Sequence, residues 1–95
     1  MRIEVRQEGG FAGLRRPPVV LESDELEPAV ARRLEELAAG LPAGGPPARG
    51  ADQMRYDVLV DDAGGRRAAT FFEPDVPAEV RELLRLARDA GRGKA

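Results

Sequence analysis

The sequence predicts a small α+β domain in which two amphipathic helices cover one face of a mainly antiparallel, four-stranded sheet. Three observations favour this class. Residues 1–6 alternate apolar and polar side chains with a period of two, and in residues 54–60 Met54, Tyr56, Val58 and Val60 share one face while Arg55 and Asp57 lie on the other, which is typical of half-buried strands. Two other segments space their apolar residues three and four apart, as helices do. Each pair of predicted strands precedes one helix, which gives the order β-β-α-β-β-α.

Two strands are expected in the N-terminal part of the chain. The first is the alternating segment 1–6, and the second is the β-branched and leucine run 19–21, which follows Pro17 and Pro18. Proline has no N–H to donate to a neighbouring strand. The second strand is therefore expected at an edge of the sheet.

A helix is expected next. Ser23 and Asp24 are plausible start signals, and Pro28 suits a first helical turn. The apolar stripe of this helix repeats at spacings of four, three and four residues: Val30, Leu34, Leu37 and Leu41. Gly40 is expected to end the helix, and the Pro- and Gly-rich residues 42–53 are expected to form a loop.

The C-terminal part repeats this arrangement. Residues 54–60 predict the clearest strand, residues 61–65 predict a turn, and residues 67–72 predict the returning strand. Pro77 then lies in the first turn of a second helix. The apolar stripe of that helix is Val80, Leu83, Leu84 and Ala87.

The composition of the 95-residue chain excludes several classes of function. Its length predicts one domain over residues 1–90 with a flexible tail over residues 91–95. Histidine and cysteine are both absent, which removes disulfides, thiolate chemistry and the commonest general base and metal ligand. No apolar run approaches membrane-spanning length and no signal-peptide pattern is present, so we expect a cytoplasmic protein without membrane association.

No set of residues predicts catalysis. Ser23 is the only serine and Thr70 the only threonine, and without histidine the familiar activated triad cannot form. Ser23 is expected to act as a helix cap and Thr70 as a strand residue. The adjacent acids at 61–62 and 35–36 are expected in a turn and on a helix surface. We therefore expect no enzyme, no cofactor and no bound metal.

Arginines on the second predicted helix leave an alternative open. They recur at spacings of four, three and four: Arg81, Arg85, Arg88 and Arg92. Such a stripe leaves open a non-enzymatic nucleic-acid-binding module or a regulatory module. The formal net charge of −2 favours a solvated helix face instead, because counterion release rewards a strong positive field. Nucleic acid is therefore the less favoured partner.

The most informative segment is a glycine-rich stretch that follows the first strand. It comprises Glu8, Gly9, Gly10, Phe11, Ala12, Gly13, Leu14 and Arg15. Glycine adopts positive φ without a Cβ penalty, so a hairpin tip here can hold an aromatic side chain outward for a partner. The alternative is a hairpin whose aromatic ring folds back onto the core, as isolated aromatics usually do. The segment lacks the Gly-Lys-Ser/Thr ending of a phosphate loop.

The order of these motifs resembles the emfourin family, small proteinaceous inhibitors of M4, thermolysin-like metallopeptidases such as protealysin. A charged N-terminal strand runs into the Gly-Gly-Phe-Ala-Gly segment at 9–13, and a leucine-rich helix follows. Residues 50–56 resemble the family's Gly-Ala-Asp entry to a strand that carries a tyrosine, and the pair 83–84 matches its final helix. The likeness covers most of the chain, from residue 1 to roughly residue 88.

The resemblance implies a monomeric inhibitor whose partner is an M4 metallopeptidase. The glycine-rich residues 8–15 would be the partner-binding site, with Phe11 or Leu14 filling an apolar subsite of the cleft. A carboxylate such as that of Glu8, or a backbone carbonyl, could still reach the catalytic metal of the peptidase. The expected mechanism is steric obstruction of the cleft without removal of zinc. The loop 42–53 departs from the family, since it is short and has little apolar content.

Overall fold

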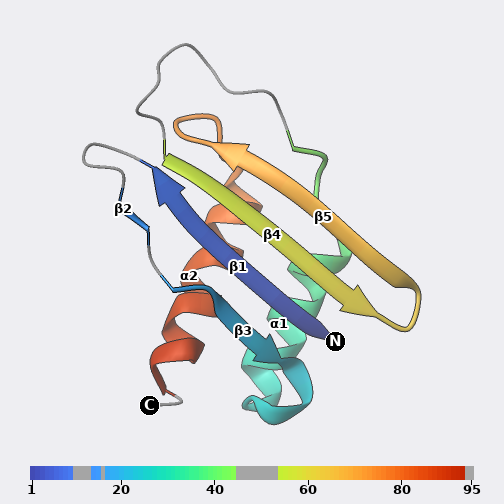
Figure 1. Cartoon of the computed structure of the whole chain (residues 1–95). Helices are drawn as coiled ribbons and strands as arrows, with labels where there is room; N and C mark the ends of the chain where they lie inside the picture. Colours follow the sequence, from blue (N-terminus) through green and yellow to red (C-terminus); the bar gives the residue numbers. More distant parts are fainter. Residues whose placement is uncertain (10–13, 16, 45–53, 94–95) are drawn as a thin grey trace.

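Within the residues that the structure describes, five strands and two helices follow one another along the chain (Figure 1). This computed structural model describes residues 1–9, 14–15, 17–44 and 54–93. The strands are β1 (Arg2–Gly9), β2 (Leu14–Arg15), β3 (Val19–Glu22), β4 (Met54–Asp62) and β5 (Gly65–Phe72). The helices are α1 (Pro28–Ala39) and α2 (Ala78–Gly93), and a 3₁₀ turn, Ser23–Glu25, precedes α1. The predicted α+β class is confirmed.

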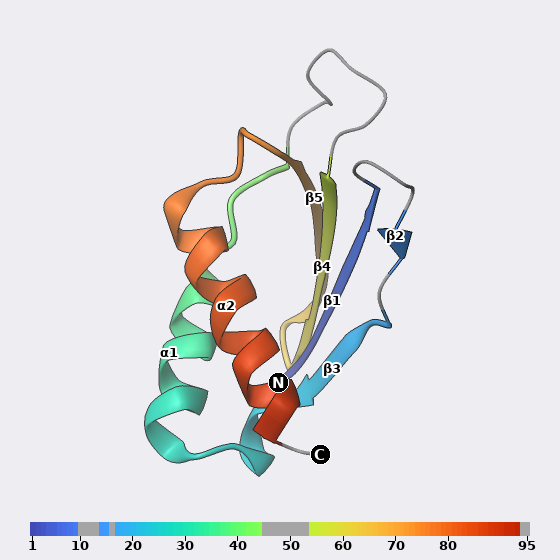
Figure 2. The same ribbon diagram turned by 90° about the vertical axis from the view of Figure 1, so that its left-hand side faces the viewer.

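The sheet is antiparallel at every described pairing, with strand order β2-β1-β4-β5. β3 also pairs with β1, so β2 and β3 are two pieces of one edge and together occupy one of four positions. Both helices lie on the same side of the sheet (Figure 2). This layering is the one that the alternating and helical patterns predict.

Pro17 and Pro18 lie between the two pieces of this edge. Val5 pairs with Val19, and Glu8 pairs with Arg15. Between these two pairs the chain covers three positions along β1 but four along the edge. One extra residue on one strand is the count of a β-bulge. Prolines cannot donate the hydrogen bonds that continuous pairing would need. The expected edge position of this segment is confirmed.

The core lies between the helices and one face of the sheet. The buried apolar side chains of the strands are Ile3, Val5, Leu21, Val58, Val60 and Phe71. The buried apolar side chains of the helices are Leu34, Leu37, Ala38, Val80, Leu83, Leu84 and Ala87. The predicted stripe of α2 is therefore buried in full. In α1 the stripe is shorter than predicted, because the helix ends at Ala39 and Leu41 packs against the core from beyond it.

Ser23 does not cap α1, contrary to expectation. The helix begins at Pro28 with Glu27 at the N-cap position and no side-chain cap hydrogen bond. The fixed φ of proline and its missing N–H suit the first helical position, which explains this start. Ser23 is buried instead; its N–H donates to the carbonyl of Met1 at 2.9 Å and its hydroxyl donates to Glu35 Oε2 at 2.6 Å.

The segment after α1 covers part of the outer edge of β5. A Cβ added to Gly44 would lie 2.1 Å from the carbonyl oxygen of Thr70 and 2.8 Å from its backbone nitrogen, so only glycine permits this approach. Arg67 of the same strand donates to the carbonyl of Ala39 at 3.1 Å. An edge covered in this way offers fewer free backbone groups to another sheet. The rest of the predicted loop, residues 45–53, lies outside the described residues.

Two boundaries in the C-terminal half differ slightly from prediction: the turn between β4 and β5, and the end of α2. The turn between β4 and β5 is only residues 63–64, and Asp62 in the last position of β4 accepts a hydrogen bond from the Gly64 N–H at 2.8 Å. Helix α2 runs to Gly93, so the domain boundary expected at residue 90 lies inside the helix. A Cβ at Gly91 would lie 3.0 Å from Cγ1 of Val19, which shows how closely this last turn approaches β3.

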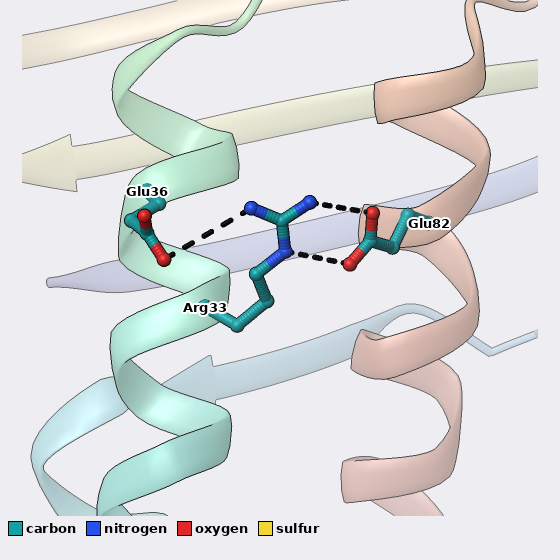
Figure 3. A network of polar contacts seen from close by, with 3 residues as sticks. All are labelled: Arg33, Glu36 and Glu82. Atoms are coloured by element: carbon teal, nitrogen blue, oxygen red, sulfur yellow. Dashed lines mark hydrogen bonds and ion pairs between the residues drawn. The ribbon is translucent and has the colours of Figure 1, made fainter.

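An ion pair joins the two helices on their exposed side (Figure 3). Nε and Nη2 of Arg33 donate to the two carboxylate oxygens of Glu82 at 2.6 and 2.7 Å, and Glu36 lies 3.9 Å from the same guanidinium. Two parallel hydrogen bonds fix both side chains in one geometry. The hydrogen bond from Arg33 lowers the pKa of Glu82, and the same contact raises the pKa of Arg33.

Glu82→Gln is expected to lower the thermal unfolding midpoint at neutral pH and to weaken its dependence on acid. The pKa of Glu82 in the folded chain lies below its ordinary value of 4.5. The carboxylate therefore stabilises the fold above that value, and this contribution is lost as the pH falls through the folded pKa. Circular dichroism melts between about pH 7 and pH 3 measure the effect. Glu36→Gln is the matched control, and an equally weakened acid dependence in that control would contradict the prediction.

Candidate functional site

Strands β1 and β2 form the base of the expected glycine-rich hairpin. Glu8 pairs with Arg15, and Gly9 pairs with Leu14, so four residues, 10–13, join the last paired positions. Gly9 has φ of 97°, in the left-handed region that favours glycine. The first glycine of the segment therefore takes a backbone conformation that other residues rarely adopt.

The expected contact residues fall into two groups. The strand pairing places Glu8, Gly9, Leu14 and Arg15 at the base of the hairpin. The tip itself lies outside the described residues: Gly10, Phe11, Ala12 and Gly13. Whether the aromatic ring of the tip points outward or onto the core therefore stays a prediction.

The base of this hairpin is supported from both sides. Glu8 pairs with Arg55 of β4 as well as with β2, and Gly9 pairs with Met54. The Glu8 carboxylate also lies 3.6 Å from the Arg55 guanidinium, with both side chains less than half exposed. A loop that leaves such a strand starts from fixed positions, which lowers the conformational freedom that it loses when it binds.

Gln7, which the sequence analysis did not single out, ties this base to helix α2. Its side-chain oxygen accepts a hydrogen bond from Nη2 of Arg88 at 2.7 Å. Its amide nitrogen lies 3.4 Å from Sδ of Met54. Gln7 pairs across the sheet with Tyr56, and the two continue the row of alternate residues that faces the helices. The strand alternation that includes Val5 was the signal that could have placed Gln7 on this inner face.

A small hollow of about 160 Å³ lies beside this network and is called the arginine hollow here. It is lined by Tyr56 of β4 and by four residues of α2: Arg81, Leu84, Arg85 and Arg88. Three of the four arginines of the predicted stripe thus gather at one place. Two of them already have partners in the fold, because Arg81 lies 2.8 Å from Glu73 and Arg88 is bonded to Gln7.

The face of the sheet away from the helices is charged. One row across the strands pairs Glu22 with Arg2, Arg2 with Asp61, and Asp61 with Arg66. Nε of Arg66 lies 2.9 Å from Asp61, and this hydrogen bond lowers the pKa of the Asp61 carboxyl. Opposite charges in facing positions of neighbouring strands stabilise a sheet. Asp61 thus serves strand pairing, whereas the sequence predicted it in the turn.

Within the described ranges, no three His, Cys, Asp or Glu side chains are grouped closely enough to hold a metal ion. The two adjacent acids of α1 have different partners. Glu35 accepts a hydrogen bond from the hydroxyl of Ser23, and Glu36 lies near Arg33.

Neither of the helices that the structure describes has the length and apolar composition of a membrane-spanning segment.

The family model of Emfourin matches residues 5–88 of this chain. The chain belongs to the Emfourin family. The match spans all eight positions from Glu8 to Arg15 and continues through both emfourin-like helices as far as Arg88, so the resemblance drawn from the sequence is confirmed. No curated protein and no solved structure matches the chain.

Proposed function

We propose that this emfourin-family chain inhibits M4, thermolysin-like metallopeptidases by placing the tip of the β1–β2 hairpin in the active-site cleft. Membership of the Emfourin family over residues 5–88 is the observation that carries this proposal. The hairpin lies inside the matched region, and its closing pair joins Gly9 to Leu14. Only four residues, 10–13, separate these two paired positions.

The proposed mechanism is steric and does not remove the catalytic metal. The chain contains neither histidine nor cysteine, the nitrogen and sulfur ligands that hold zinc most strongly in proteins. Glu8 lies 3.6 Å from Arg55, so its carboxylate is already engaged at the base of the hairpin. We therefore assign the blocking role to the tip, with Phe11 or Leu14 as the apolar anchor in a subsite of the peptidase.

Inhibition assays against several M4 peptidases test the proposal. The purified chain is titrated against each enzyme with a fluorogenic peptide, and a serine peptidase is included as a control. We expect competitive inhibition of M4 enzymes at submicromolar to micromolar concentration, with the zinc content of the enzyme unchanged after the complex is separated. No inhibition of any M4 enzyme at micromolar concentration would rule the function out. Loss of zinc from the enzyme would rule out the mechanism alone.

A further inference from the structure

Two arginines of α2, Arg85 and Arg88, have no carboxylate oxygen within ion-pair distance among the residues that the structure describes. Six other arginines lie within 4.0 Å of a carboxylate oxygen: Arg6, Arg33, Arg55, Arg66, Arg67 and Arg81. Arg88 bonds to the neutral side chain of Gln7. Arg85 is exposed. The hydrogen bond from Arg33 and, to a smaller extent, the charge of Arg85 lower the pKa of Glu82, but it is Arg33 that forms the ion pair with this carboxylate. The charge of these two guanidinium groups is therefore not neutralised by a direct contact.

The two side chains differ in a way that suits an incoming anion. Nη2 of Arg88 is held at 2.7 Å from Gln7 Oε1, which orients the guanidinium while leaving its charge intact. Arg85 is exposed and can turn toward a ligand. Tyr56 and the buried Leu84 supply the remaining lining of the hollow. Guanidinium groups donate in a planar fork that matches a carboxylate, and about 160 Å³ admits one acidic side chain.

The arginine hollow lies at the same end of the sheet as the hairpin tip. The pair Gln7 and Tyr56 precedes the final pair of β1 and β4, Gly9 and Met54, by two residues. Gly9 is also the last paired residue before the tip. In Figure 1 the ends of β1 and β2 that meet the tip lie beside the start of β4. A protein that holds the tip in its cleft therefore has its surface close to the hollow.

We infer that the arginine hollow binds a carboxylate side chain on the peptidase surface beside the cleft. This inference rests on the proposed function and adds a second, charged contact to it. A protein carboxylate fits better than a nucleic acid, because only two arginines that line the hollow, Arg85 and Arg88, lack an ion pair. Glu79, Glu82 and Asp89 interrupt the same helix, whereas a phosphate backbone needs a continuous cationic surface. Opposite charges across an interface raise the association rate, and salt weakens this effect.

Arg85→Glu tests the inference, with Arg32→Glu as the matched control. Both arginines are exposed on helices and both variants change the net charge equally, but Arg32 lies on α1, away from the hollow. We expect Arg85→Glu to raise the inhibition constant about 30-fold and to remove most of its dependence on ionic strength. Arg32→Glu should change the constant by less than about threefold. Circular dichroism melts verify that both variants are folded.

The outcomes separate this inference from the proposed function. If the unmodified chain inhibits and both variants inhibit equally well, the inference is overturned while the inhibitor function stands. If the unmodified chain inhibits no M4 enzyme, the function and the inference fail together. A fluorescent DNA that binds the chain at low salt, and loses binding in Arg85→Glu but not in Arg32→Glu, would assign the hollow to nucleic acid and overturn the inference. Restored inhibition by Arg85→Glu of a peptidase with lysine in place of one cleft-side acid would support it directly.

Discussion

Phe11→Ala is expected to weaken inhibition of an M4 peptidase by about 30-fold or more, which corresponds to about 2 kcal/mol. Phe11 is the one bulky apolar residue among positions 10–13, the four residues between the paired Gly9 and Leu14. An aromatic anchor that fills a desolvated subsite loses most of its binding free energy when it is cut back to a methyl group. The inhibition constant is measured by titration at fixed ionic strength.

Val20→Ala is the control for this substitution. Val20 lies on β3, further along the same edge of the sheet, and the residue is 39% exposed. Its truncation removes exposed apolar surface without touching the hairpin and should leave inhibition unchanged. The unfolding midpoint of Phe11→Ala distinguishes the two orientations that the sequence leaves open. A folded variant with unchanged inhibition and a lowered midpoint would place the ring on the protein's own core and remove it from the site.

Leu83→Ala is expected to lower the free energy of unfolding by about 3 kcal/mol. Leu83 has no exposed surface and belongs to the buried stripe of α2 that faces the sheet. The substitution loses the burial of the removed atoms and leaves a cavity that the surrounding side chains fill only in part. For a domain whose whole stability is roughly 5–15 kcal/mol, this is a large share. Urea unfolding followed by circular dichroism measures the change.

Leu86→Ala provides the matched control for the core. Leu86 lies three residues further along α2 and is only partly buried, at the margin of a surface groove that Leu26 and Val30 also line. Its truncation is expected to cost less than half as much as that of Leu83, because the groove is open to water. Equal losses at the two positions would show that the burial pattern of α2 differs from the one described.

Periodic patterns made most of the fold predictable. Ile3 and Val5 alternate with charged residues, and this alternation specifies which face of β1 meets the helices. The two-residue strand β2 was not predicted, since Leu14 and Arg15 are too few to show a period. Ser23 was wrongly predicted to cap the helix, because a serine shortly before a helix is a good capping residue. The same hydroxyl can equally well donate to a nearby side chain. The structure resolves this by burying Ser23 against Glu35.

The candidate site was predictable only where its signal is local. The glycines around Phe11 lie within five consecutive residues, and they predicted a hairpin whose base the structure contains. The bond between Gln7 and Arg88 joins residues that are 81 positions apart, and the fold alone brings them together. The same holds for Arg33 and Glu82, 49 positions apart. The spacing of the arginines predicted an arginine-rich helix face. Which of these arginines lack an ion pair depends on partners that are distant in the sequence.

The closing pair of the hairpin has a consequence for engineering. Gly9 and Leu14 are anchored by strand pairing, Gly9 on both of its sides. The four intervening positions can therefore be randomised while the framework is kept constant. Selection from such a library against chosen proteases would show how far one scaffold can be redirected by its loop alone.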